Sequence, residues 1–286
     1  MAVDTVEWYD WSELPPARPL RHENRRIYVG SETCARFLPG LEQALDYCQA
    51  QIDMGRYLTV VTSWLSDEFL AKAIELIELL SERHQQLEVV CNDWGLLHAA
   101  NGRFACELVA GRLLAVQRTD PRLAMFGRVA LQRTMEKDVP HVEGFTARLK
   151  HCAPSSALLA HLRQSPLDCP QTLNLLQTKH VHRFEVSNLL QGLETSPRAG
   201  WRVTLHYPDV LIAVARDCRS LSSRKCPGKP DSTCSTPVAH AYDDFPVSLY
   251  RDANAWFYAN PNVPDNLSEM GIDRLVRKRK LSSRPW

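Results

Sequence analysis

Between residues 26 and 95 the sequence alternates β-branched runs with amphipathic helical patterns, and this alternation constrains the fold more than any other feature. The segments between the runs, about 38–54 and from Ser66 onward, repeat apolar residues at helical spacing. The predicted strands are Arg26–Gly30, Tyr57–Trp64 and Leu87–Cys91. Because strand and helix recur about every thirty residues, the pattern predicts βα units and a parallel sheet.

The remaining sequence extends this α/β pattern within one domain. The chain has 286 residues, 44% of them hydrophobic, which is enough for one large core. Strand patterns return at Val181–Val186 and from Trp201. We predict an irregular (β/α) barrel of the TIM type over residues 26–270. Residues 1–25, rich in Pro, Trp and charges, are predicted to form an arm over the barrel, and residues 271–286 a basic C-terminal tail.

Charge and hydropathy exclude several classes of function. Lys and Arg number 34 against 33 for Asp and Glu, so a net charge of +1 gives no general attraction to nucleic acid or acidic lipid. The longest apolar run, Val210–Ala215, is far too short to cross a membrane. The N-terminus has no apolar signal region, so we expect a cytoplasmic protein. Glycine-rich nucleotide, zinc-protease and serine-hydrolase motifs are not found in the sequence.

Three cysteines, Cys218, Cys226 and Cys234, lie in a polar stretch with seven residues between neighbours. Ser, Pro, Gly, Arg and Lys separate them, so the stretch has no apolar period and is predicted to be a loop. Thiolates gathered near basic side chains suit a soft metal or an iron–sulfur cluster. A structural zinc site and three unrelated thiols are the alternatives, although zinc sites favour closer cysteine pairs. We favour a metal, with iron–sulfur ahead of zinc.

Polar residues at two predicted strand ends are the candidates for catalysis. Asn92 and Asp93 directly follow the third strand, and Glu185 and Asn188 lie near the end of a later one. In a parallel barrel, side chains just past the carboxyl ends of strands line the working face, where Asp93 would be a general base or bind substrate. The alternative is structural, because Asn and Asp also form turns and cap helices.

Several segments resemble the collagenase-like peptidase family (peptidase U-thirty-two). The similarity covers roughly residues 26–235 and is strongest at 91–122. It rests on Cys-Asn-Asp-Trp-Gly-Leu-Leu at 91–97, Gly-Arg-Leu-Leu at 111–114, Asp-Pro-Arg at 120–122 and Arg-Phe-Glu-Val-Ser-Asn at 183–188. The segment Ile27–Cys34 looks like the opening strand of the UbiV-type, iron–sulfur branch of this family.

The resemblance implies a barrel of βα units with a [4Fe–4S] cluster on four cysteines. By match, the ligands are Cys34, Cys218, Cys226 and Cys234. It also implies oxygen-independent hydroxylation of a quinone ring or an RNA base, as in ubiquinone biosynthesis, together with a partner protein of the same family. The last two cysteines are farther apart here than in UbiV-type members, and the basic C-terminal segment is additional.

We therefore expect an iron–sulfur component of a hydroxylation. One alternative is a binding or scaffold protein with a structural cluster or zinc, and another is a peptidase, for which the sequence shows no convincing nucleophile–base pair. The position of Cys34 agrees with the ligand set, because it follows the first predicted strand by a short polar turn. That position predicts that Cys34 lies on the same barrel face as the end of the strand leading to Cys218, with barrel closure bringing first and last strands together.

Overall fold

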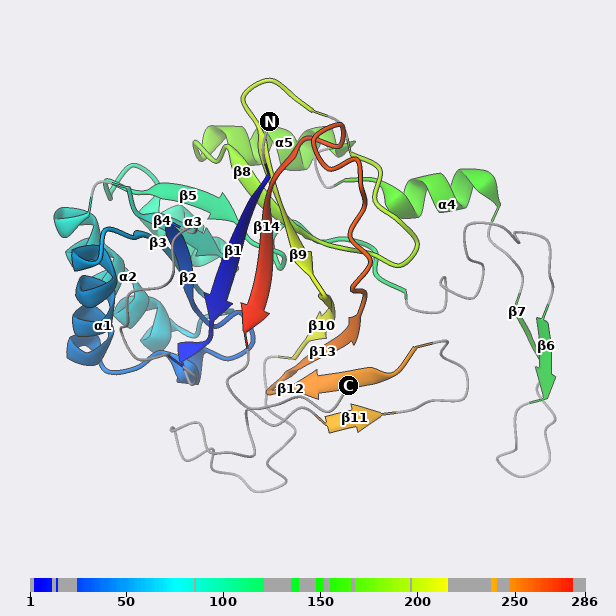
Figure 1. Cartoon of the computed structure of the whole chain (residues 1–286), viewed down its shortest axis with the longest axis horizontal. Helices are drawn as coiled ribbons and strands as arrows, with labels where there is room; N and C mark the ends of the chain where they lie inside the picture. The colour runs from blue at the N-terminus through cyan, green and yellow to red at the C-terminus, as the bar shows by residue number, and fades with distance from the viewer. Residues whose placement is uncertain are drawn as a thin grey trace.

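The computed structural model describes residues 3–11, 14, 25–84, 86–120, 135–138, 148–151, 155–165, 168–195, 197–215, 238–240 and 247–279. Within these residues eight parallel strands close into a barrel in the order β1-β14-β9-β8-β5-β4-β3-β2 (Figure 1). The barrel strands are β1 (Asp4–Tyr9), β2 (Arg26–Gly30), β3 (Tyr57–Val61), β4 (Glu88–Cys91), β5 (Glu107–Ala110), β8 (Arg183–Ser187), β9 (Arg202–Tyr207) and β14 (Ile272–Arg279). The structure therefore confirms the predicted α/β barrel with a parallel sheet.

Helices alternate with strands in only part of the barrel. The helices α1 (Leu41–Asp53), α2 (Asp67–Arg83) and α3 (Trp94–Ala100) follow β2, β3 and β4 in turn. Two further helices, α4 (Ser156–Arg163) and α5 (Pro170–Thr178), precede β8, and the described residues between β8 and β9 contain no helix. The described residues also contain no helix long and apolar enough to cross a membrane.

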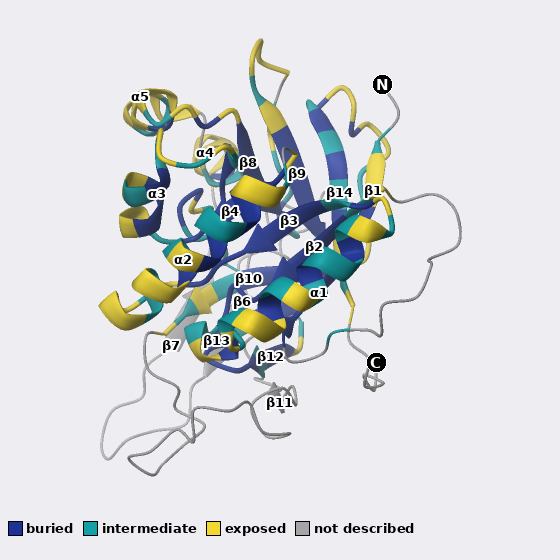
Figure 2. Ribbon diagram, turned by 90° about the vertical axis from the view of Figure 1, so that its left-hand side faces the viewer, coloured by how far each residue is buried: buried dark blue, intermediate teal, exposed yellow. Residues whose placement is uncertain are grey.

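Successive side chains along each barrel strand point alternately outward and inward, so the strands separate two packed layers. Outward side chains such as Val29, Val60 and Val89 join Leu76 and Ile77 of α2 in the main core. The strands are accordingly buried behind helices whose outer faces are exposed (Figure 2). A second cluster fills the barrel interior and contains Val6, Trp8, Tyr28, Val61, Val90, Val109 and Val276. The interior is therefore a packed core and not a channel.

An ion-pair network closes the N-terminal end of the interior. Arg274 donates hydrogen bonds of 2.7 and 3.0 Å to the two carboxylate oxygens of Glu88 and one of 2.8 Å to the hydroxyl of Tyr28. Arg26 lies 3.3 Å from Glu88, and Glu88 is only 3% exposed. Among the described residues, paired charges thus fill this end of the barrel interior, and the apolar cluster lies beyond them along the axis.

A second sheet lies at that C-terminal end. Its strands are antiparallel and run in the order β10-β13-β12-β11, and Figure 1 shows the arrowheads of β1, β14 and β9 pointing toward it. The bounds are β10 (Asp209–Val214), β11 (Val238–His240), β12 (Leu249–Asp252) and β13 (Ala255–Ala259). This inserted sheet separates β9 from β14 in the chain. A separate pair of strands, β6 (Met135–Asp138) and β7 (Arg148–His151), forms a two-stranded sheet.

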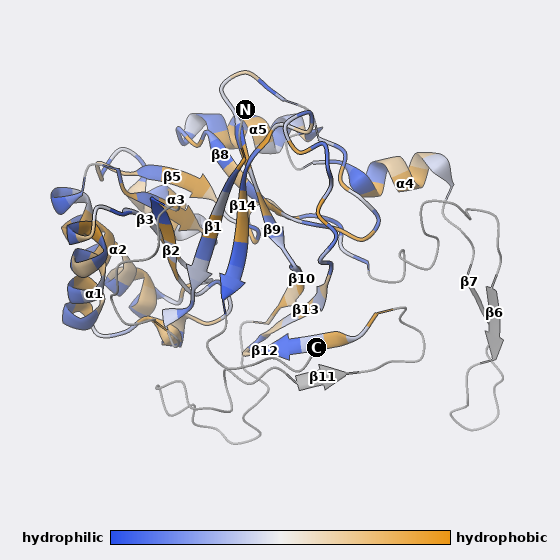
Figure 3. Ribbon diagram, viewed as in Figure 1, coloured by the Kyte–Doolittle hydropathy of each residue, from blue (hydrophilic) through white to orange (hydrophobic). Residues whose placement is uncertain are grey.

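The predicted arm and tail are wrong for the residues that form β1 and β14. These two strands pair with each other, from Asp4↔Arg274 to Tyr9↔Arg279, and so close the barrel. The composition of 272–279 is misleading because the alternate residues Arg274 and Lys278 are buried cations beside carboxylates. The hydrophilic end of β14, blue in Figure 3, is thus part of the barrel wall. The barrel extends beyond the predicted range of 26–270 at both ends.

Candidate functional site

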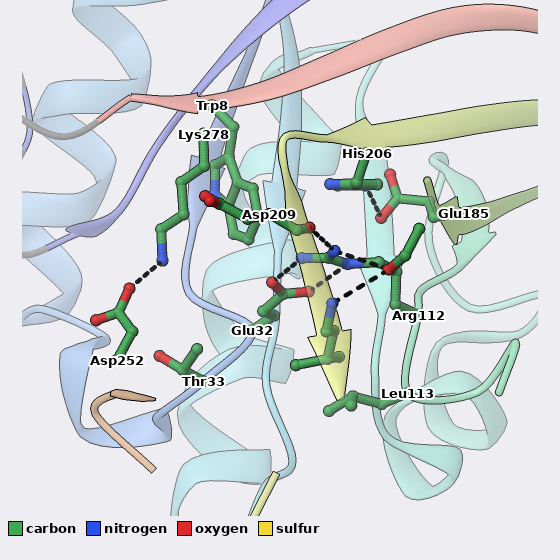
Figure 4. Close-up of polar contacts among 12 residues, drawn as sticks. Trp8, Glu32, Thr33, Arg112, Leu113, Glu185, His206, Asp209, Asp252 and Lys278 are labelled. Atoms are coloured by element: carbon green, nitrogen blue, oxygen red, sulfur yellow. Dashed lines mark hydrogen bonds and ion pairs between the residues drawn. The ribbon is translucent and has the colours of Figure 1, made fainter. Parts of the chain in front are cut away.

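Buried charges gather where the C-terminal ends of the barrel strands meet the inserted sheet (Figure 4). They come from segments far apart in the sequence, and each side chain is at least nine-tenths buried. We call them the mouth network: Asp10, Glu32, Arg112, Asp209, Asp252 and Lys278. This end of a parallel barrel is the one from which side chains of several strands can act on a common ligand.

Arg112 is the hub of the mouth network. Its guanidinium forms a two-pronged ion pair with Glu32, in which Nε donates to Oε2 at 3.0 Å and Nη2 donates to Oε1. Nη1 donates to the hydroxyl of Ser187 at 3.0 Å and to the backbone carbonyl of Asp209 at 2.8 Å. The planar fork of arginine suits such a bidentate contact. Arg112 thereby joins the loop after β2, the end of β8 and the start of the inserted sheet.

Lys278 is the second cation of the network. Its Nζ lies 3.3 Å from Oδ2 of Asp10 and 3.4 Å from Oδ2 of Asp252, and 4.9 Å from the centroid of the Trp8 ring. Burial opposes the charge of Lys278, but the carboxylates of Asp252 and Asp10 outweigh it and raise the pKa of the lysine above its usual range. Lys278 is therefore an ammonium ion at neutral pH.

Glu185 and His206 form a buried pair beneath the mouth network. His206 Nε2 lies 3.0 Å from Glu185 Oε2, and the imidazole meets the ring of Trp8 edge-on, with centroids 5.6 Å apart. Oε1 of Glu185 has no hydrogen-bond partner in the described part of the chain. Glu185, predicted as a site residue, thus faces the barrel interior, and its partner His206 was not predicted.

Asp93 makes the helix-capping contact that the structural alternative predicted, and its catalytic role stays a prediction. It is the N-cap of α3, where Oδ1 accepts a hydrogen bond of 3.1 Å from the amide of Leu96. Oδ2 accepts a longer one, 3.4 Å, from the amide of Leu65. The carboxylate therefore fixes the turn between β4 and α3 and lies outside the mouth network.

Asn92 and Asn188 also connect loops. Asn92 accepts a hydrogen bond of 2.9 Å from the amide of Leu113 and donates one of 2.8 Å to the carbonyl of Thr62. Asn188 donates to two carbonyls in the segment after β13, at 3.2 and 2.9 Å. These contacts account for the polar side chains at both strand ends, and their catalytic role stays a prediction.

Cys34 is the one predicted metal ligand that the structure describes. It follows β2 on the C-terminal side of the barrel, is half-buried, and lines an apolar pocket together with Trp11, Leu38 and Leu76. Cys218, Cys226 and Cys234 lie outside the described residues. Among the described residues no group of three or more His, Cys, Asp or Glu is arranged to hold a metal.

The strand argument used to place Cys34 beside Cys218 needs correction. β2 and β9 are not neighbours, because β1 and β14 lie between them, and the strand that leads to Cys218 is β10 of the inserted sheet. Cys218 itself lies outside the described residues, and its sharing a face with Cys34 stays a prediction. The inserted sheet lies at the C-terminal end of the barrel (Figure 1), and Cys34 follows the C-terminal end of β2.

Three other described cysteines are poor metal ligands. Burial raises the pKa of Cys48 to about 12 and that of Cys106 to about 11, and it raises the pKa of Cys91 further. All three therefore remain protonated thiols near neutral pH, whereas a metal ligand must be a thiolate. Cys91 packs in the outer core with the helices.

Sequence reasoning missed Glu32, Arg112 and Lys278. Glu32 lies in the polar turn after the first predicted strand, and Arg112 lies in one of the segments that carried the family resemblance. A buried pair joining them was not visible because 80 residues separate the two side chains. Comparisons of the chain with family models, with curated proteins and with solved structures found no match.

Proposed function

We propose that this chain is an iron–sulfur protein whose [4Fe–4S] cluster is bound at the C-terminal end of the barrel by Cys34, Cys218, Cys226 and Cys234. The observation that carries the proposal is the position of Cys34. Its half-buried thiol lies on the side of the barrel where the inserted sheet borders the three-cysteine stretch. The last described residue before that stretch is Ala215, directly after β10, and the first after it is Val238 in β11.

The residues fit such a group in their donor chemistry. Cysteine thiolates are the ligands of four-iron clusters, and Cys34 differs from the buried thiols of Cys48 and Cys91 in being half-buried at a loop. When bound, a cluster of this kind supplies one-electron redox chemistry or a Lewis-acidic iron. The chain's own contribution is a rigid frame: Arg112 and Glu32 hold the loops at the mouth, above the packed interior.

The reaction and partner follow from the family resemblance. We extend the proposal to oxygen-independent hydroxylation of a quinone ring or an RNA base, carried out with a partner protein of the same family. Because cysteine thiols stay reduced in the cytoplasm, this location belongs to the same proposal.

A second candidate is a binding or scaffold protein with a structural iron–sulfur or zinc site. The observation that favours it is the engagement of Asp93, Asn92 and Asn188 in hydrogen bonds to the backbone. Hydrogen bonds of this kind support a structural role for these three side chains.

Anaerobic purification tests the proposal. We expect a brown protein with about four iron and about four acid-labile sulfide per chain. Cys34→Ser should lower the iron content or make the cluster unstable, whereas the control Cys106→Ser should retain it. A colourless protein with stoichiometric zinc would contradict the iron–sulfur assignment. A cluster that dithionite cannot reduce would favour the scaffold.

A further inference from the structure

Two charged side chains of β8 lie inside the barrel, where apolar packing prevails. Alternate residues of this strand point inward, so Arg183, Glu185 and Ser187 face the barrel axis, whereas Phe184 and Val186 pack in the outer core. Arg183 is 2% exposed and Glu185 is 1% exposed. Every polar atom of these two side chains therefore needs a partner inside the protein.

Each of the two side chains has one polar atom without such a partner. The two Nη atoms of Arg183 each donate to the carboxylate of Asp273 at 2.7 Å, and Nη1 also donates to the hydroxyl of Thr204 at 3.0 Å. In the described part of the chain, Nε of Arg183 and Oε1 of Glu185 have no hydrogen-bond partner. Buried polar atoms of folded proteins nearly always have one, either protein or water.

Tyr28 brings a third group from the opposite wall. In the closed strand order, β2 and β8 lie on opposite sides of the barrel, so their inward side chains meet near the axis. The buried Tyr28 hydroxyl accepts a hydrogen bond of 2.8 Å from Arg274, and its own proton has no acceptor among the described residues. The Tyr28 ring lies 6.5 Å from the ring of His206, whose Nε2 lies 3.0 Å from Oε2 of Glu185.

Electrostatic effects also indicate that the Tyr28 hydroxyl is close to both β8 side chains. Burial raises the pKa of Tyr28, the charge of Arg274 lowers it, and the charge of Glu185 raises it. Glu185 acts more strongly than Glu88, although Glu88 shares the Nη1 donor of Arg274 with the hydroxyl. The charge of Arg183 acts on Tyr28 as well. Because such effects weaken with distance, the three polar groups lie in one region of the interior.

The chemistry of these three groups selects what can bind between them. An anion would be repelled by the Glu185 carboxylate, and a cation by the guanidinium of Arg183. A neutral molecule that accepts hydrogen bonds from Nε and the hydroxyl and donates one to Oε1 satisfies all three. The surrounding interior is a packed apolar cluster, so the molecule must be small. Water has these properties, and a buried water typically makes about three hydrogen bonds.

We infer that Nε of Arg183, the hydroxyl of Tyr28 and Oε1 of Glu185 bind one internal water molecule inside the barrel. This water joins β2 to β8 across the axis. It also connects the ion-pair network at the N-terminal end of the interior to the Glu185–His206 pair beneath the mouth network. The inference goes beyond the proposed function and does not depend on it, because none of these side chains is a proposed cluster ligand.

A high-resolution crystal structure of the full chain tests the site directly. We expect one water oxygen at about 2.5–3.2 Å from each of the three atoms. A direct hydrogen bond from the Tyr28 hydroxyl to Oε1 of Glu185, with no water between them, would overturn the inference. An ion at this position would overturn it as well.

Oxygen-17 magnetic relaxation dispersion counts long-lived internal waters in solution, and two matched variants assign the count. Glu185→Gln retains an oxygen that can accept the hydrogen bond of the water, so it should keep the wild-type count. Glu185→Leu has no polar side-chain atom and should lower the count by about one water per chain. Equal counts in wild type and Glu185→Leu would contradict the site.

Tyr28→Phe covers a failure of Glu185→Leu to fold, because it removes only the hydroxyl and keeps the packed ring. With one of three hydrogen bonds lost, the residence time of the water should shorten about tenfold. The control Tyr258→Phe removes a buried hydroxyl of the inserted sheet and should leave that residence time unchanged. The same residence time in wild type and Tyr28→Phe would exclude the hydroxyl from the site and overturn the inference.

Discussion

Glu88→Gln is the sharpest test of the ion-pair network that seals the barrel interior. The carboxylate is 3% exposed and accepts hydrogen bonds of 2.7 and 3.0 Å from Arg274. Burial by itself raises the pKa of Glu88, but the hydrogen bonds and charge of Arg274, with the charge of Arg26, lower it from 4.5 to about 2. That difference corresponds to about 3 kcal/mol of stability at neutral pH. The variant also leaves buried cations without their anion, so we expect a loss of about 3–5 kcal/mol.

Urea unfolding of the metal-free chain over a pH series measures this effect. A carboxyl group whose pKa is lowered by folding contributes stability above its unfolded pKa, and the contribution is lost as pH falls from 4.5 toward 2. The wild-type and Glu88→Gln curves should therefore converge below pH 4.5. The control Glu78→Gln breaks an exposed pair with Arg103 and should cost about 0.5 kcal/mol or less. A loss under about 1 kcal/mol near neutral pH, or parallel pH profiles, would refute the reasoning.

Three further predictions concern other local contacts. Gly111→Ala should lower stability by about 1–3 kcal/mol in thermal unfolding, because an added Cβ would lie 2.3 Å from the buried side-chain oxygen of Asn92. The control Gly40→Ala should be near neutral, because its Cβ would meet no atom within 4 Å. Asp93→Ala should lose about 0.5–2 kcal/mol as a lost helix cap, and Asp93→Asn should retain both stability and activity. If Asp93→Asn instead abolished activity with stability unchanged, Asp93 would be catalytic. In the metal-free chain, iodoacetamide should modify exposed Cys169 before buried Cys48, because hydrogen bonds from Thr172 lower the pKa of Cys169 and burial raises that of Cys48. Mass spectrometry follows the order of modification, and the reverse order would contradict the burial argument.

The family resemblance and the proposed ligand set remain predictions. Measurement of the bound metal tests the ligand set. The structure adds the position of one proposed ligand, Cys34, and the strands that border, in sequence, the stretch with the other three. It also shows what the candidate catalytic residues contact, while their catalytic role stays a prediction. Asp93 caps α3, Asn92 links two loops, and Glu185 lies inside the barrel.

The sequence by itself determined the strands and helices between residues 26 and 91. Each strand there is a short apolar run, and each helix repeats its apolar residues with a helical period, so local pattern and tertiary packing agree. The observed β2, β3 and β4 lie within one residue of the predicted starts. Even the capping role of Asp93 was open to local reasoning, because it requires only the next turn of chain.

Only the tertiary structure decided the barrel's closure and the composition of its mouth. β1 and β14 are strands because they pair with each other, although their residues are about 270 positions apart in the chain. Arg274 and Lys278 look like solvent-exposed cations in the sequence, yet each is buried beside carboxylates from distant strands. A charged side chain is stable inside a protein only when a partner of opposite charge is brought to it, and the partner is supplied by closure of the fold and not by the neighbouring sequence.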